Sequence, residues 1–68
     1  MEVSINGRTY TVPTTATVLD ALKALNIAED RQGIAIAVQA AVVPRSKWKA
    51  HALKQGDAIE VVTAAQGG

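Results

Sequence analysis

The group best suited to chemistry in this chain is the α-carboxylate of its last residue, Gly68, which follows Gln66 and Gly67. Because glycine has no Cβ, such an end can pass through a channel too narrow for a branched residue. An α-carboxyl group is ionised at neutral pH, so it can attack the α-phosphate of ATP and form an acyl-adenylate. We therefore predict that Gly68 is the adenylation site and that Gln66 and Gly67 thread it into a partner's active site.

The residues before this end determine how far it can reach. If residues 63–68 leave the sheet, they span roughly 20 Å at about 3.3 Å per extended residue. We expect a flexible tail over residues 63–68. The alternative is an ordinary frayed or truncated terminus, because small residues and disorder are both common at chain ends.

No side chain offers a comparable reactive centre. The chain has no cysteine, which excludes disulfides, thiolate metal sites and a persulfide carried by this chain. His51 is the only histidine, so it has no second histidine or cysteine with which to form a metal site or a nucleophile pair. The carboxylates are dispersed, and capping and turn roles account for Asp20 and Asp57. We expect no catalytic residue, no metal and no cofactor bound by this chain.

Length and composition limit the remaining possibilities. A chain of 68 residues forms one domain, and its hydrophobic residues, 49% of the total, include no Phe, so the core must be built from aliphatic side chains. The net charge of +1 argues against strong nonspecific binding to nucleic acid. The sequence has no apolar run long enough for a membrane span and no signal-peptide pattern at its start. We expect a soluble, cytoplasmic protein.

One segment is locally basic. Residues 45–54 hold Arg45, Lys47, Lys49, His51 and Lys54 around Trp48. This could be a basic patch with a stacking aromatic, but one aromatic is too few for a stacking platform. We favour a solvated connection in which Trp48 packs on the core and the charges face water.

The first half of the chain predicts a hairpin and then a helix. Asn6-Gly7 separates two segments in which apolar and polar residues alternate, which places Val3 opposite Tyr10. Pro13 lacks a backbone N–H and therefore ends the second strand. Thr17 is a candidate N-cap, with Asp20 able to reach back as in a capping box. Apolar residues recur at helical spacing, which predicts an amphipathic helix that ends near Asn26. These residues are Val18, Leu19, Leu22 and Leu25.

The second half predicts strands. The segment 33–39 is predicted to be a central strand with Ile34, Ile36 and Val38 on one face. Val42-Val43 is predicted to be a short edge strand that Pro44 ends. A last strand is predicted from about Ala58 to Thr63, after a turn. Ile59 and Val61 should face the core. We expect an α+β fold, a single domain over 1–68 with a mixed sheet of four to five strands and one main helix on one face.

The opposite face of the last strand is a candidate docking surface. Glu60, Val62 and Ala64 should lie there, next to Ala35 and Ala37 if the two strands are neighbours. Isolated surface valines and alanines are ordinary, so this patch is either a flat docking surface beside the tail or an unremarkable surface.

These segments together resemble a known family, the β-grasp, ubiquitin-like sulfur carriers, and within it the thiamine-biosynthesis carriers (ThiS). The resemblance spans the whole chain. One departure is residues 39–41, where the family pattern leads us to expect a polar turn containing Asn or Gly. The matching segments are Val3-Ser4-Ile5-Asn6-Gly7, Ala16-Thr17-Val18, Ile34-Ala35-Ile36-Ala37-Val38, Val42-Val43-Pro44-Arg45-Ser46 with Trp48, Gly56-Asp57, Val61-Val62-Thr63-Ala64 and Gln66-Gly67-Gly68.

The resemblance implies a reaction cycle in which this protein is a substrate of other enzymes and not a catalyst. A ThiF-like adenylyltransferase uses ATP to activate the Gly68 carboxylate. A cysteine desulfurase supplies a persulfide sulfur that displaces AMP, and the resulting thiocarboxylate donates sulfur to a ThiG-like thiazole synthase. From the net charge and the lack of a long apolar run, we expect no nucleic-acid or membrane partner.

Two alternatives share the same reactive end. The terminal Gly-Gly also occurs in the small subunit of molybdopterin synthase, so the sulfur could go to molybdopterin or another metabolite. A ubiquitin-like modifier, joined through Gly68 to a lysine, ranks lower because Gln66 stands where ubiquitin has an arginine before its Gly-Gly. A small enzyme or nucleic-acid binder ranks last.

Overall fold

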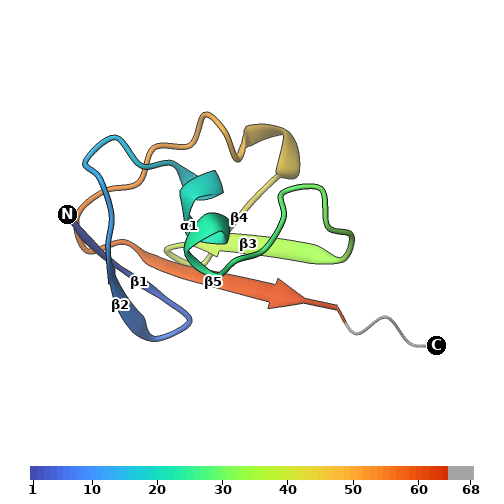
Figure 1. The fold of residues 1–68 in the computed structure, drawn as a ribbon, viewed down its shortest axis with the longest axis horizontal. Helices are drawn as coiled ribbons and strands as arrows, with labels where there is room; N and C mark the ends of the chain where they lie inside the picture. The colour runs from blue at the N-terminus through green and yellow to red at the C-terminus, as the bar shows by residue number, and fades with distance from the viewer. Residues whose placement is uncertain (65–68) are drawn as a thin grey trace.

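A computed structural model of the protein describes residues 1–64. It has a mixed five-stranded sheet in the order β2-β1-β5-β3-β4, with one α-helix across one face (Figure 1). The predicted α+β class and β-grasp sheet are confirmed. The elements are β1 (Glu2–Ile5), β2 (Arg8–Thr11), α1 (Val18–Ala24), β3 (Ile34–Val38), β4 (Ala41–Val43), a 3₁₀ turn (Arg45–Lys47) and β5 (Ala58–Thr63).

The β1–β2 hairpin has the predicted register. Val3 lies opposite Tyr10 and Ile5 opposite Arg8. Asn6 and Gly7 form the two-residue turn, both with positive φ (52° and 84°), which suits the right-handed twist of the flanking strands.

Helix α1 begins and ends close to where its sequence predicts. Thr17 is extended, and its backbone N–H donates to Asp20 Oδ2 at 2.7 Å, as expected of the capping pair. The helix ends at Ala24, and Asn26 follows with φ 59°. Leu22 is fully buried in the helix, whereas Leu19 and Leu25 only pack at the margin of the core.

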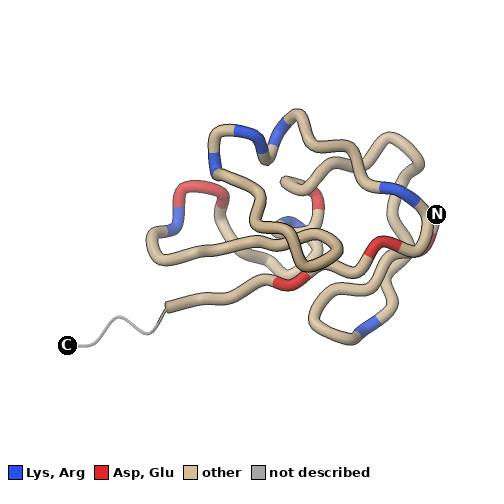
Figure 2. Tube along the Cα trace, turned by 180° about the vertical axis from the view of Figure 1, so that it is seen from behind, with Lys and Arg blue, Asp and Glu red and all other residues tan. Residues whose placement is uncertain are grey.

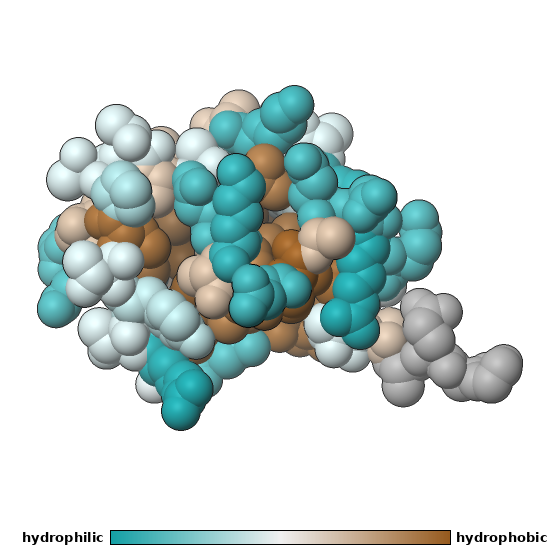
Figure 3. Space-filling view, in the orientation of Figure 1, coloured by the Kyte–Doolittle hydropathy of each residue, from teal (hydrophilic) through white to brown (hydrophobic). Residues whose placement is uncertain are grey.

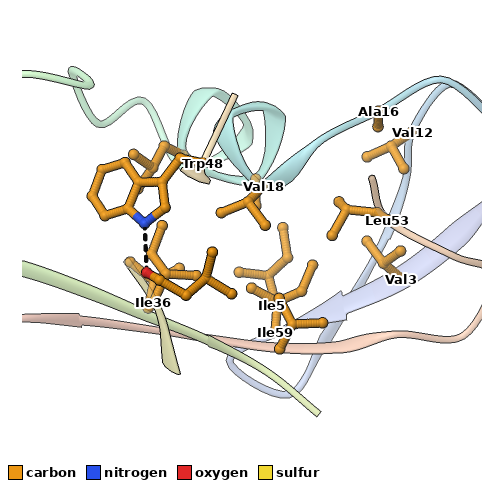
Figure 4. Packing of buried hydrophobic residues seen from close by; sticks show 14 residues of the cluster. Val3, Ile5, Val12, Ala16, Val18, Ile36, Trp48, Leu53 and Ile59 are labelled. Carbon is orange, nitrogen blue, oxygen red and sulfur yellow. Dashed lines mark hydrogen bonds between the residues drawn. The ribbon is translucent and has the colours of Figure 1, made fainter. Parts of the chain in front are cut away.

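The core lies between the helix and one face of the sheet (Figure 4). Ile5 and Ile59, from the neighbouring strands β1 and β5, are each 1% exposed. Trp48 is buried as predicted, and its indole N–H donates to the carbonyl of Val43 at 2.9 Å. Since a buried indole N–H needs an acceptor, this bond fixes the basic connection to the end of β4.

The last strand ends at Thr63, as predicted, so the tail that we expected over residues 63–68 does not begin at residue 63. Thr63 belongs to β5 and pairs with Ile34. The backbone N–H of Ala64 then donates to the carbonyl of Gly33 at 2.7 Å. The pairing continues because Gly33, just before β3, offers one more acceptor. The remainder of the predicted tail, residues 65–68, lies outside the described residues.

The turn between β3 and β4 has an unusual composition. Its two residues, Gln39 and Ala40, have φ of 50° and 67°, in the left-handed region that favours Gly or Asn. The turn thus has the geometry of a tight hairpin but lacks the Gly or Asn that this geometry prefers. These are the same residues at which the sequence departs from the polar turn expected for the family. Ala40 is therefore held in a strained conformation by the pairing on either side of it.

We predict that Ala40→Gly raises the free energy of unfolding by about 1 kcal/mol, because glycine adopts this φ without the Cβ clash. Urea denaturation followed by circular dichroism would measure it. Ala35→Gly is the matched control: Ala35 is an exposed residue of β3 without positive φ, and its replacement should lower stability. Equal effects of the two changes would contradict a strained turn.

Candidate functional site

The strand that leads to the C-terminus, β5, is the middle strand of the sheet. It runs parallel to β1 on one side and antiparallel to β3 on the other. Figure 1 shows it passing beneath α1 and emerging at one end of the molecule. The predicted reactive and threading residues Gln66, Gly67 and Gly68 lie outside the described residues, so the site that the structure describes is the strand that precedes them in the sequence.

Asn6 completes the pairing of β5 where β1 ends. Its side-chain Oδ1 accepts from the backbone N–H of Val61 at 2.8 Å, and its Nδ2 donates to the Val61 carbonyl at 3.1 Å. The amide thus takes the place of one more strand residue. The sequence predicts only the turn role of Asn6, because its second role depends on β5 being the neighbour of β1.

Gln39 has the same function at the opposite end of β5. Its backbone N–H donates to the carbonyl of Ala58 at 2.8 Å, and its side-chain Oε1 accepts from the Ala58 N–H at 2.7 Å. Two turn residues, one from each flanking hairpin, therefore satisfy backbone groups of β5 that no strand reaches. This explains why Gln39 occupies a left-handed position: its side chain is long enough to reach Ala58.

The predicted docking residues Glu60, Val62 and Ala64 are all exposed on the face of β5 that points away from α1. The register places Ala37 beside Glu60 and Ala35 beside Val62, as the sequence predicted. Val62 is 59% exposed. We call Glu60 and the apolar residues around it the outer-face patch; its members are Ala35, Ala37, Val42, Glu60, Val62 and Ala64.

Val42 belongs to this patch although sequence analysis described it only as part of an edge piece. It lies opposite Ala37 and is 75% exposed. The alternation of β4, with Val43 buried and Val42 outward, was the signal that could have placed it there. The patch thus spans three neighbouring strands, β5, β3 and β4.

The basic connection lies on the other side of the molecule. Its backbone packs against the start of α1, since the N–H of Val18 donates to the carbonyl of His51 at 3.0 Å and that of Leu19 to the carbonyl of Trp48 at 3.2 Å. The blue segments in Figure 2 are concentrated along this connection. Its Lys side chains are exposed, so the prediction of a solvated connection is confirmed.

Arg45 differs from the lysines of this connection because its side chain contacts other parts of the protein. Its guanidinium lies over the ring of Trp48, 4.4 Å from the centroid, and donates to the backbone carbonyls of Glu29 and Arg31, the latter at 2.8 Å. It therefore ties the loop before β3 to the connection after β4. An open hollow of about 600 Å³ lies here, lined by Ala28, Glu29, Asp30, Arg45, Trp48 and Lys49.

Other kinds of site are not apparent over residues 1–64. No three His, Asp or Glu side chains there gather as metal ligands would, and no helix of the described chain is long and apolar enough to span a bilayer. Figure 3 shows hydrophilic side chains surrounding the hydrophobic atoms on one face of the molecule.

A five-stranded mixed sheet in the order β2-β1-β5-β3-β4 with one helix across one face defines a protein of the β-grasp, ubiquitin-like fold. The chain belongs to the ThiS family, whose sequence pattern matches residues 3–68. The family resemblance seen in the sequence is thereby confirmed.

Solved structures agree with this assignment. The crystal structure of the thiamine biosynthesis protein ThiS from Geobacter metallireducens is 28% identical, with a TM-score of 0.78, and each chain is covered completely. A solution structure of a thiamine biosynthesis protein from the same organism has 28% identity and a TM-score of 0.75, covering 100% of this chain and 88% of that one. No curated protein matches this chain.

We predict that Asn6→Gly lowers the free energy of unfolding by about 1 to 2 kcal/mol, because it leaves the backbone groups of Val61 without partners while retaining a residue that tolerates positive φ. Hydrogen exchange should report faster exchange of the Val61 amide. Asn26→Gly is the matched control, since Asn26 is exposed and also has positive φ (59°). Unchanged protection at Val61 would show that the Asn6 amide contributes nothing.

Proposed function

We propose that this protein is the sulfur carrier for the thiazole ring of thiamine, with the carboxylate of Gly68 as the group that is activated and then carries sulfur. The observation that carries the proposal is the match to the ThiS family, which extends through the Gly67-Gly68 pair. The likeness to a thiamine biosynthesis protein over the whole of both chains supports it. In this role the protein is a substrate of partner enzymes, working in the cytoplasm, and not itself an enzyme.

The proposed chemistry starts at the terminal carboxylate. An oxygen of Gly68 attacks the α-phosphate of ATP, held by a ThiF-like adenylyltransferase, and pyrophosphate leaves. The product is an acyl-adenylate, whose AMP is a good leaving group. Gln66 and Gly67 would thread the terminus to the ATP, since two consecutive glycines at the end give an unhindered approach.

Sulfur is then transferred to the activated end. The terminal sulfur of a persulfide, formed by a cysteine desulfurase, attacks the acyl carbon of Gly68 and displaces AMP. A second thiol reduces the resulting acyl disulfide, forming a disulfide and releasing the thiocarboxylate, which donates its sulfur to a ThiG-like thiazole synthase. Because this chain has no cysteine, all of the thiols come from its partners.

The outer-face patch is the proposed docking surface for the adenylyltransferase. Val62 and Val42 are large apolar side chains that the fold leaves in solvent. The patch includes Ala64, the last described residue, so a partner that covers it contacts the chain four residues before Gly68.

Sulfur delivery to molybdopterin and attachment to a lysine remain alternatives because they begin at the same carboxylate. The similarity to structures of thiamine biosynthesis proteins favours thiazole formation over both. The intact mass of the protein from its native cell separates them: one sulfur in place of one oxygen supports a sulfur carrier, and a branched linkage to a lysine supports a modifier.

We predict that deleting Gly68, or adding a residue after it, abolishes adenylation and growth without added thiamine, while the thermal midpoint of unfolding stays unchanged. Residues 1–64 contain the whole described core, so this change should affect chemistry alone. ATP–pyrophosphate exchange with the adenylyltransferase of the same organism would measure the first effect. Adenylation of the blocked protein would exclude Gly68 as the reactive group.

We predict that Val62→Asp weakens binding to the adenylyltransferase at least about tenfold, because it puts a charge into an apolar contact. Its effect on the free energy of unfolding should stay near 1 kcal/mol, the range of strand propensities at an exposed site. Thr9→Asp, at an exposed position of the edge strand β2, is the control and should bind like the unchanged protein. Equal affinity of the Val62 and Thr9 variants would remove the patch from the docking surface.

A further inference from the structure

Glu60 has an unusual position for a carboxylate. On the outer face it lies beside Ala37 of β3 and between Ala58 and Val62 along β5, while on the β1 side the Asn6 amide is already bonded to the backbone of Val61. It is the charged member of the outer-face patch and is exposed.

The described outer face carries no base that could pair with Glu60. Alternation along the strands puts two acidic residues on this face, Glu2 and Glu60, and otherwise hydroxyl or apolar side chains; these are Ser4, Thr9, Thr11, Ala35, Ala37, Val42, Ala58, Val62 and Ala64. Arg8 lies opposite Ile5 and so projects from the other face.

The positive charge is concentrated elsewhere. The connection over residues 45–54 holds four of the seven Lys and Arg residues and packs against the start of α1, on the side of the sheet opposite to the patch (Figure 2). The protein is therefore polarised, acidic on its outer face and basic on its helical side. Such a charge distribution orients a molecule as it approaches a partner.

A partner that covers Val62 and Ala37 must also take Glu60 out of water. Burying an unpaired carboxylate is costly, and the apolar contacts of a few small side chains cannot offset it. The cost is removed only when the partner supplies a cation at that point. A second copy of this chain, docked through the same face, would bring carboxylates and no base, so it does not fit.

We infer that the docking surface of the adenylyltransferase is an apolar area bearing a Lys or Arg side chain that pairs with Glu60. This rests on the proposed function and identifies the chemistry of the partner. The pair fixes the register of docking, because an ion pair within an apolar contact tolerates little displacement. Because Glu60 lies two residues before Val62 and four before Ala64, the same pair sets where the last described residues lie on the partner.

The test uses the full-length protein and the adenylyltransferase of the same organism, with binding measured by calorimetry and ATP–pyrophosphate exchange measured at saturating carrier. Glu60→Gln should weaken binding at least about tenfold and Glu60→Lys at least about a hundredfold. Glu2→Gln is the matched control: it removes the same charge from the same face, outside the patch, and should cost less than about fivefold.

The outcomes separate this inference from the proposed function. If the unchanged protein is not adenylated, the proposed function fails. If it is adenylated but Glu60→Gln and Glu2→Gln weaken binding equally, only long-range attraction operates and the inferred pair is wrong. Replacing the partner's basic residue by Glu should restore binding of the Glu60→Lys protein. If no such replacement among the basic residues of the partner's docking surface restores binding, the inferred pair is also wrong.

Discussion

The structure depends on keeping the backbone of β5 paired beyond the ends of its shorter neighbours. β1 ends at Ile5 and β3 at Val38, which would leave backbone groups at Val61 and Ala58 without a strand partner. The side-chain amide of Asn6 fills the first place, and the backbone N–H and side-chain Oε1 of Gln39 fill the second. An amide side chain has the donor and acceptor of a peptide group, so it can substitute for one strand residue. The middle strand is thereby held in place up to the point where the chain leaves the domain.

This arrangement assigns separate tasks to the two sides of the sheet. Ile59 and Val61 of β5 face the core, and Glu60 and Val62 between them face outward. One strand therefore anchors the domain and presents the patch that we propose for docking. Because these side chains alternate along the same backbone, the position of the patch relative to the chain end is fixed by the register with β3.

Much of this could be predicted from the sequence because the determining signals are local. Asn6-Gly7 specifies its hairpin, Thr17 and Asp20 the helix start, and the alternation from Ala58 to Thr63 the last strand. What was missed depends on contacts between distant segments. The bond from the Ala64 N–H needs the carbonyl of Gly33, and the second role of Asn6 needs Val61, 55 residues away. The proposed reactive residues lie outside the described chain, so Gly68 stays a prediction.

Arg45 has a consequence that reaches across the molecule. Its planar guanidinium bonds the carbonyl of Arg31, two residues before the Gly33 carbonyl that accepts from Ala64. A single side chain on the helical side thus supports the loop that supplies the last described partner of the β5 segment. Lysine, a point charge on a flexible stem, cannot brace the loop in the same way. Natural variants at this distant position can therefore shift the Gly33 carbonyl and weaken the pairing of Ala64 without touching β5 itself.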